Sequence, residues 1–422
     1  MANLNFAGHN TLYASHGLHA YAAKCPPQLA RYGVRYYSRV GDTILDPMAG
    51  SGTTLVEAKI LGRNAIGYDI DPLARLLARV KTNSVRDAEI AAGHDIVLKR
   101  CRRDLKNLRS KTNSLALRRR AQPPNFRNRD YWFTRDVASS LSLISHHIAK
   151  ARISNRVRDF LWVALSSLIL SKTSVANARD IIHSRHHFQK HREAPNVLEK
   201  FSARTKVMRR QIRDFIEMCA THPKTKIHTR VGDARRLRIE DESIDLVFTS
   251  PPYATALDYP RAHFLAIPWM KSVLEVDLPK YFSKTPRYIG SERGRFSAGF
   301  EIASTLSQYP LTRTIIARLT KTSLRQAKLT QRYFLDMQRV MAEVARVLKP
   351  RRHGIVVVCP SHIRKVRIPT QRVLTEIADQ EGLRLKRQFT RTINERRRLL
   401  PYAKKSFGTR MDIEYILIFQ KT

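Results

Sequence analysis

The sequence TSPPY at positions 249–253 combines residue types that could hold a ligand at the end of a strand. Residues 244–248 are typical of a short buried strand in a parallel sheet. Pro251 and Pro252 must end that strand because neither has an N–H to donate. In open α/β sheets, ligands bind at the carboxyl edge of the strands. TSPPY therefore predicts a site whose polar groups are oxygen atoms, including the Ser250 hydroxyl.

A second pattern, LDPMAGSGTT at positions 45–54, predicts a ligand-binding turn between a strand and a helix. Gly50 and Gly52 allow a tight turn, and a helix that starts near Thr53 directs its N–H groups toward the ligand. Position 55 is Leu, which weakens a dinucleotide interpretation, and no G-K-S or G-K-T follows to form a phosphate loop. A carboxylate at Asp46 would also repel a pyrophosphate.

Acidic residues at two predicted strand ends indicate the kind of cofactor. Asp46 ends the first strand, and Asp69 stands at the end of the next, where such folds accept hydrogen bonds from a ribose. Carboxylates suit a cationic cofactor that carries ribose hydroxyls, and S-adenosylmethionine meets both demands. Asp71 is expected to cap the helix that follows.

With DPMAGSGTT and TSPPY in one chain, the sequence resembles the amino-group DNA methyltransferases. Their cofactor motif is D-P-F-x-G-S-G, and their catalytic motif is Asp, Asn, Ser or Thr followed by two prolines and an aromatic residue. HGLHAYAAKCPPQLARY resembles the segment that flanks the cofactor, and GDARRL the segment that meets the adenine. DYPRAH, IGSER and INERRRLLP with EYILIF are similar to the cytosine-N4 branch. The resemblance covers residues 13–82 and 228–422, and Met48 replaces the usual Phe.

The resemblance implies S-adenosylmethionine as the cofactor and assigns roles to individual residues. The cofactor-binding residues would be Lys24, Asp46, Pro47, Met48, Gly50, Ser51, Gly52, Thr53, Asp69 and Asp233. The catalytic residues would be Ser250, Pro251, Pro252 and Tyr253.

The chemistry of a base amino group explains why the motif contains prolines. The lone pair of such an amine is delocalised into the ring, so transfer needs acceptors for its hydrogens. The Ser250 hydroxyl and the Pro251 carbonyl would accept them, and Tyr253 would stack on the flipped base. Methylation of carbon 5 would need a thiolate from a Pro-Cys pair, and Cys25 and Cys359 instead precede prolines.

The elements that position these residues form two βαβ halves around a helical insertion. Apolar runs predict strands at 43–45, 64–68, 244–248, 355–359 and 414–419, another from Ile227, and a helix at 370–380, while KPRRHG is expected to turn the chain. The resemblance implies an α/β fold: a Rossmann-like S-adenosylmethionine-dependent methyltransferase sheet of seven strands, the last one antiparallel. The predicted parts are 1–82 and 226–422, which form the catalytic domain, and 83–225, an inserted basic helical domain.

The charge predicts a polyanionic partner. The 422 residues include 77 Lys and Arg against 35 Asp and Glu, a formal net charge of +42, which favours nucleic acid and here double-stranded DNA. Residues 99–129 are especially basic, and Arg118, Arg119 and Arg120 are expected to contact phosphates without selecting a sequence. Base recognition could come from the insertion or from 271–330. A cognate restriction endonuclease is a candidate partner, and the oligomeric state is not predicted.

Several other classes of site are disfavoured. The four cysteines, Cys25, Cys101, Cys219 and Cys359, lack C-x-x-C spacing, which indicates small buried side chains rather than disulfides or a zinc ribbon. His183, His187 and His191 repeat every four residues, but interleaved Arg and Lys favour a DNA-facing helix, and no metal is assigned. Without a signal peptide or a long apolar run, the protein is expected to be cytoplasmic, with no membrane contact.

Three alternatives stay open at this point. N6-adenine methylation is one, although Ser at the first motif position favours cytosine N4. An RNA base methyltransferase is another, but the stretch of some forty residues before the glycine turn leaves no room for a separate RNA-binding domain. The third is a catalytically silent DNA-binding protein, against which the intact Asp46, Gly50, Gly52, Ser250 and Tyr253 argue.

Overall fold

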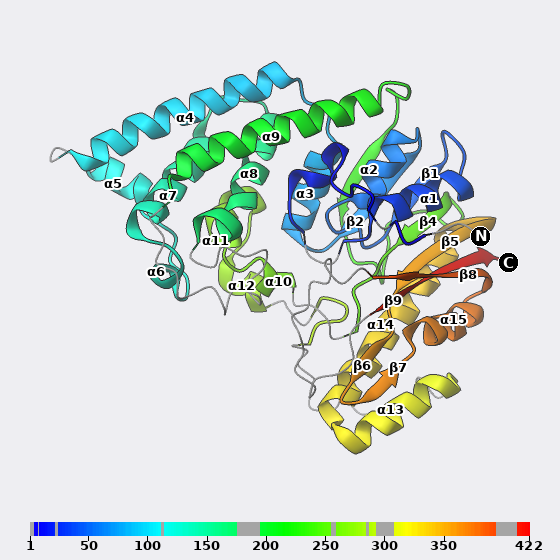
Figure 1. Cartoon of the computed structure of the whole chain (residues 1–422). Helices are drawn as coiled ribbons and strands as arrows, with labels where there is room; N and C mark the ends of the chain where they lie inside the picture. Colours follow the sequence, from blue (N-terminus) through cyan, green and yellow to red (C-terminus); the bar gives the residue numbers. More distant parts are fainter. Residues whose placement is uncertain are drawn as a thin grey trace.

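A seven-stranded sheet forms one part of the protein, with a group of helices extending to its left in Figure 1. The computed structural model describes residues 4–6, 8–21, 24–110, 114–174, 195–254, 259–283, 287–292, 308–393 and 412–422. The strands are β1 (Thr43–Asp46), β2 (Asn64–Asp69), β3 (Ile227–Val231), β4 (Ile244–Thr249), β5 (Leu348–Val358), β8 (Leu383–Thr392) and β9 (Ile413–Lys421). Their order is β3-β2-β1-β4-β5-β9-β8, and β9 runs antiparallel to both of its neighbours. The predicted seven-stranded fold with an antiparallel last strand is confirmed.

Helices cover both faces of this sheet because its central strand β4 is buried on both sides. The covering helices are α1 (Pro27–Tyr37), α2 (Thr53–Ile60), α3 (Pro72–Thr82), α14 (Leu324–Val347) and α15 (Thr370–Gln380), and α13 (Pro310–Thr322) packs against α14. On β4, Leu246 and Phe248 pack with α1 and α2 in one core. Val247 faces the other way and packs with α14 and α15. Such burial on both faces is typical of parallel strands.

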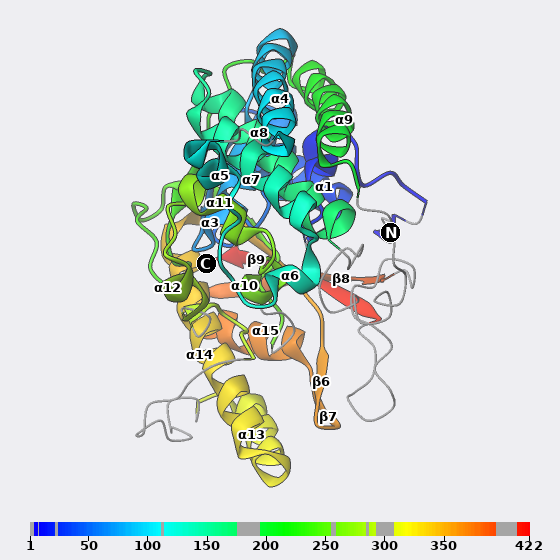
Figure 2. The same cartoon turned by 90° about the vertical axis from the view of Figure 1, so that its left-hand side faces the viewer.

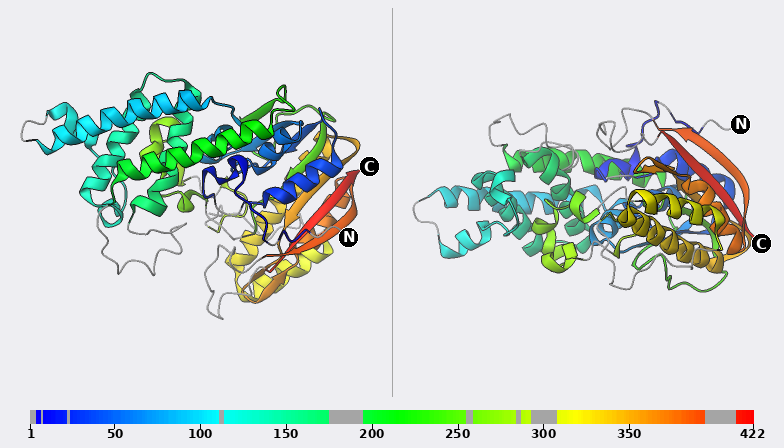
Figure 3. Two further views of the ribbon diagram at one scale, coloured as in Figure 1. Left: turned by 45° about the horizontal axis from the view of Figure 1, so that its top comes forward. Right: turned by 90° about the horizontal axis from the view of Figure 1, so that it is seen from below.

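A helical body extends from one side of the sheet, while both chain ends lie at the sheet (Figures 1 and 3). Its helices are α4 (Asp87–Arg109), α5 (Leu115–Ala121), α6 (Arg129–Trp132), α7 (Arg135–Lys150), α8 (Asn155–Leu168) with a π-helical turn (Ile169–Thr173), and α9 (Val197–Met218). On α7, Val137, Leu141, Ile144 and Ile148 recur at helical spacing and are buried.

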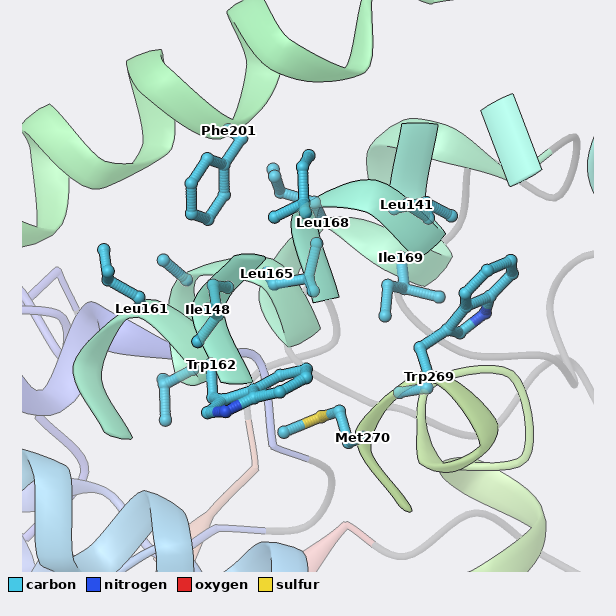
Figure 4. Close-up of a cluster of buried hydrophobic side chains, with 14 of the residues drawn as sticks. Leu141, Ile148, Leu161, Trp162, Leu165, Leu168, Ile169, Phe201, Trp269 and Met270 are labelled. Carbon is cyan, nitrogen blue, oxygen red and sulfur yellow. The ribbon is translucent and has the colours of Figure 1, made fainter. Parts of the chain in front are cut away.

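The helical body also contains residues that follow the TSPPY motif. Helices α10 (Tyr259–Ala262), α11 (Ile267–Leu274) and α12 (Leu278–Ser283) join its core. Trp269 and Met270 of α11 lie beside Trp162 and Ile169 (Figure 4). The division at residue 226 stays a prediction, but the packing of the helical body extends beyond 83–225.

The structure differs from the sequence prediction at the beginning of β5. KPRRHG does not turn the chain, because residues 349–354 lie inside β5. Arg351 adopts a φ of 62°, and the pairing with β4 shifts register between Ile244 and Leu246. At this irregularity the polar residues of KPRRHG are accommodated within the strand, which continues to Val358. Two further features were not predicted: β8, and a hairpin of β6 (Ser361–Ile363) and β7 (Val366–Ile368).

The described residues bear on two of the predictions, that no segment spans a membrane and that the cysteines are free. Within the described residues, no helix combines the length and apolarity needed to cross a bilayer. All four cysteines are buried and free, as expected. The cytoplasmic location stays a prediction.

A buried carboxylate fastens the N-terminal segment to α2. Glu57 is fully buried and accepts hydrogen bonds from Tyr13 Oη (2.6 Å), His16 Nε2 (2.7 Å) and Arg31 Nε (2.6 Å). Tyr13 and His16 lie at or in a 3-10 turn (Ala14–Leu18), and Arg31 lies on α1. These contacts fix the segment that leads to Lys24.

The burial of His16 predicts that the protein loses stability in mild acid. Burial lowers the pKa of its imidazole to about 4, although the Glu57 contact acts in the opposite direction, and the unfolded value is about 6.5. The unfolded chain therefore binds the proton more readily, so stability present above pH 6.5 is lost as pH falls toward 4. We expect the free energy of unfolding to fall between pH 7 and 4.5 by roughly 1 to 3 kcal/mol more in the wild type than in His16→Gln, measured by urea denaturation. Equal pH dependence in both proteins would contradict this role.

Candidate functional site

A pocket opens at the carboxyl ends of β1, β2 and β4, where the sequence predicted a cofactor site. The predicted cofactor residues that line it are Lys24, Asp46, Pro47, Met48, Gly50, Ser51, Thr53, Asp69 and Asp233. Gly52 does not line the pocket. Of the predicted catalytic residues, Ser250 and Pro252 line it, while Pro251 and Tyr253 do not. One cavity therefore joins the two sequence motifs.

The glycine turn after β1 shapes the floor of the pocket. Gly50 has a φ of 50°, and its N–H donates to Asp69 Oδ2 at 2.8 Å. Gly52 has a φ of 83°, and a Cβ there would lie 2.8 Å from Ala78 Cβ on α3. Gly52 thus allows this turn to pack closely against α3, and its role in binding the cofactor stays a prediction. Ser51 is 2% exposed, and its Oγ has no hydrogen-bond partner among the described residues.

Asp46 stabilises the same turn from within. Its Oδ2 accepts from Thr54 Oγ1 at 2.6 Å, and its Oδ1 accepts from Met48 N at 3.2 Å. Burial raises the pKa of Asp46 to about 6, while the Thr54 hydrogen bond counteracts that rise. This carboxylate is therefore engaged in shaping the turn as well as lining the cavity.

Asp69 links the glycine turn to the turn after β2. Besides its Gly50 contact, its Oδ1 accepts from Asp71 N at 2.8 Å. Burial, followed by the nearby Asp71 carboxylate, raises the pKa of Asp69 to about 7. Each of its oxygens can accept a second hydrogen bond, so the carboxylate can still bind hydroxyl groups in the pocket.

Asp71 caps α3 as expected and has a further structural role. Its Oδ1 accepts from the backbone N–H groups of Leu73 (2.9 Å) and Ala74 (3.0 Å). Its Oδ2 accepts from the hydroxyls of Tyr281 (2.8 Å) and Tyr288 (3.0 Å). The turn after β2 is thereby tied to α12 and to the segment 287–292.

Asp233 lines the pocket beyond β3, but an arginine already engages its carboxylate. Arg235 contacts both Asp233 oxygens, at 2.9 Å through Nε and 2.6 Å through Nη2, and also reaches Asp336 at 2.8 Å. Burial alone would raise the pKa of Asp233, yet the contacts with Arg235 hold it below its usual value. Asp233 is thus an ionised acceptor in a fixed orientation.

Aromatic side chains form a wall of the pocket that the sequence analysis did not assign. Tyr259 stacks near Tyr21, with ring centroids 6.0 Å apart, and near Tyr288, at 6.4 Å. All three line the cavity. Tyr21 lies in HGLHAYAAKCPPQLARY and Tyr259 in DYPRAH, while Tyr288 immediately precedes IGSER. The resemblance of those segments to the family was therefore the available signal. Beside this wall, Lys24 Nζ donates to His16 O at 2.9 Å, and burial lowers the pKa of Lys24 to about 8.

The TSPPY motif follows β4 directly, since that strand ends at Thr249. The Tyr253 hydroxyl donates to Glu414 Oε1 at 2.8 Å, and Glu414 on β9 also pairs with Arg391 on β8. A Cβ at Gly290, whose φ is 75°, would lie 2.6 Å from Tyr253 O. Tyr253 is therefore fixed by strands from the end of the chain and closely covered by 287–292.

The predicted nucleic-acid residues lie far from this pocket. Arg118, Arg119 and Arg120 are exposed on α5, at the distal end of the helical body (Figure 1). Arg120 Nη1 lies 3.5 Å from Asp104 Oδ2, so Arg120 forms an ion pair within the protein. His183, His187 and His191 fall outside the described residues, and the described residues contain no cluster of His, Cys, Asp or Glu suited to a metal ion.

The residues of the pocket fit S-adenosylmethionine. The buried Ser51 hydroxyl lacks a partner next to the first turn of α2, and the amine of Lys24 lines the cavity, so both suit the cofactor's carboxylate. Asp69 retains acceptor capacity for ribose hydroxyls. Carboxylates, rather than phosphate-binding groups, dominate the polar lining, which suits a sulfonium cofactor.

The chain is similar to several known proteins. A family model described as DNA methylase matches residues 5–78. The Type II methyltransferase M.MvaI of Kocuria varians is 25% identical over 414 residues, covering 93% of this chain and 87% of the relative. The Type II methyltransferase M.MjaII of Methanocaldococcus jannaschii is 50% identical over 66 residues, covering 16% of this chain and 12% of the relative. A solved SAM-dependent methyltransferase from Methanosarcina mazei is 10% identical with a TM-score of 0.32, covering 92% of this chain and 96% of its own. The family-model match and the Type II relatives fit the resemblance to the amino-group DNA methyltransferases that the two sequence motifs predict.

Proposed function

We propose that the protein transfers a methyl group from S-adenosylmethionine to the amino group of a base flipped out of double-stranded DNA. The favoured target is N4 of cytosine, and N6 of adenine is the alternative. One observation carries the proposal: Ser250 and Pro252 line the same cavity as Asp46 and Asp69. The cofactor and the amine that receives its methyl group would therefore meet in this cavity. Ser250 at the first position of the motif supports cytosine through its resemblance to the N4 branch.

Each end of the cofactor has a matching group in this pocket. Lys24, the Ser51 hydroxyl and the first turn of α2 would bind its carboxylate, and Asp69 its ribose. Asp233, held by Arg235, would accept from the adenine amine. When bound, the cofactor supplies an electrophilic methyl group on a positively charged sulfur.

The protein's part in the transfer is to activate the base amine, a weak nucleophile, by accepting hydrogen bonds from it. The Ser250 hydroxyl and the Pro251 carbonyl would accept hydrogen bonds from the two amine hydrogens, which increases electron density on nitrogen as it becomes tetrahedral. Because Pro251 and Pro252 lack N–H groups, no backbone donor of theirs competes for that nitrogen. The same acceptors would stabilise the positive charge that develops in the transition state.

The DNA partner follows from charge as well as from the family. The formal charge of +42 suits a long polyanion, and the exposed Arg118 and Arg119 would contact phosphates at the distal end of the helical body. Because the relatives named above are Type II methyltransferases, a restriction endonuclease of matching site is a candidate partner in the cell.

The product identifies the reaction directly. We expect duplex DNA incubated with the protein and labelled cofactor to contain N4-methylcytosine after digestion and mass spectrometry. Ser250→Ala should lower turnover by about 10²-fold while DNA affinity changes little, because the lost acceptor matters most in the transition state. N6-methyladenine would select the alternative. A 5-methylcytosine product would refute the mechanism, since the chain has no Pro-Cys pair.

Cofactor affinity should rise with pH because Asp69 must be ionised to accept from ribose hydroxyls. The pKa of Asp69 in the free protein is about 7, so affinity measured by calorimetry should increase up to about tenfold from pH 6 to pH 7.5. Asp46, whose pKa is about 6, contributes only at the lower end of this range. Asp69→Asn should bind more weakly and lose most of the pH dependence. If the variant retains the wild-type profile, another group binds the ribose.

The contact between Tyr253 and Glu414 predicts that the C-terminal strand positions the base-stacking ring. Tyr253→Phe keeps the ring but removes the hydroxyl that Glu414 accepts from, so KM for DNA should rise several-fold while cofactor affinity is unchanged. Glu414→Gln retains an acceptor and should be milder. The double variant should be no worse than Tyr253→Phe, because both changes act on one contact. Additive losses would show that the two residues act independently.

A further inference from the structure

The β6–β7 hairpin leaves the sheet at the edge that carries the candidate site. Strand β5 runs parallel to β4, and Val356 pairs with Thr249, the last residue of β4. Two residues further, β5 ends at Val358, and the hairpin begins at Ser361. It therefore starts near the level of the TSPPY turn and projects past the sheet beside α13 (Figure 2).

The two faces of this hairpin differ in chemistry. Ile363 and Ile368 are buried and pack with Ile315 and Leu319 of α13 in a common core. The exposed residues of the hairpin are Arg364, Lys365 and Arg367. The apolar face thus anchors the hairpin on α13, and a row of cations faces solvent.

The turn of the hairpin uses residues that its backbone geometry disfavours. Arg364 and Lys365 are the two residues between the paired Ile363 and Val366, and their φ angles are 49° and 65°. A two-residue turn with both φ angles positive prefers Asn-Gly, because a Cβ is strained in the left-handed region. Here two long cations occupy both positions. Among the described residues, no hydrogen bond or ion pair to these two side chains explains that choice, so a ligand outside the chain is the more economical reason.

We propose that the β6–β7 hairpin is a DNA-binding element whose Arg364, Lys365 and Arg367 contact backbone phosphates of the duplex beside the flipped base. The inference rests on the proposed function, which makes duplex DNA the polyanion. A two-stranded ribbon has the width to enter the major groove, and Lys and Arg at its tip reach the flanking phosphates. Because α5 lies at the distal end of the helical body and the hairpin lies beside α13 (Figure 1), DNA would be held from two separate parts of the protein.

The structure offers a variant that removes both tip charges without endangering the fold. Arg364→Asn with Lys365→Gly gives the turn its preferred residues, so the thermal unfolding midpoint should stay equal or rise. Binding of a duplex oligonucleotide, followed by fluorescence anisotropy over a salt series, should weaken several-fold at low salt. The slope of log affinity against log salt should become shallower by about 2, as expected for two lost phosphate contacts. Cofactor affinity should not change.

A matched control removes two cations from the opposite edge of the sheet. Arg384 on β8 pairs with Gln420 on β9, and Gln420 pairs in turn with His353 on β5. His353 is the first residue of β5 that pairs with β9, so Arg384 lies at the amino-terminal edge of β5, opposite the edge from which the hairpin leaves. Arg384 and Lys386 are exposed, so Arg384→Gln with Lys386→Gln should leave the salt slope close to that of the wild type.

The outcomes separate the hairpin proposal from the proposed function. An unchanged slope in the hairpin variant, with normal wild-type binding, would overturn the hairpin proposal alone. An equal loss in both variants would do the same, because it would reflect net charge rather than a contact. A wild-type protein that does not bind duplex DNA would overturn the proposed function and the hairpin proposal with it.

Discussion

The carboxylate of Asp69 joins the two turns on which the pocket depends. It accepts from Gly50 N after β1 and from Asp71 N after β2, so the turns of two adjacent parallel strands are fixed relative to each other. Asp71 extends the connection to Tyr281 and Tyr288, which come from far later in the chain. Burial of Asp69 raises its pKa, which makes the carboxylate sensitive to what binds beside it. A cationic cofactor would favour its ionised form.

The TSPPY turn is held by contacts with residues that are remote in sequence. Glu414, on the antiparallel strand β9, binds the Tyr253 hydroxyl and is itself paired with Arg391. Gly290 lets the segment 287–292 approach the Tyr253 carbonyl, where a side chain would clash. The prolines remove donors from the turn, but these tertiary contacts orient its tyrosine. A substitution in β9 could therefore alter base capture without touching the cofactor.

The helical body is continuous with the catalytic part rather than a separate attachment. Its core includes residues of α3, which follows Asp71, and of α11, which follows the TSPPY turn. Trp269 and Met270 of α11 pack with residues of α7 and α8 in the same core. The elements that follow Asp71 and the TSPPY turn are therefore both anchored in the helical body through α3 and α11. The hairpin on α13 lies outside this core, so it can contribute affinity without disturbing the same packing.

The local elements and the chemistry of the short motifs could be predicted from the amino-acid sequence. The positions of β1, β2, β4 and α15 follow from apolar runs bounded by Gly and Pro, because those signals act within a few residues. Asp46, Gly50, Asp69 and Ser250 were found because strand ends in a parallel sheet share one edge. The remaining features became visible in the folded protein. It showed that Gly52 serves helix packing, that Arg235 engages Asp233, and that KPRRHG continues β5. It also brought Glu414 to Tyr253 and added α10–α12 to the helical body. These outcomes depend on pairings between residues far apart in the chain, and such contacts leave no periodic or local signature in a single sequence.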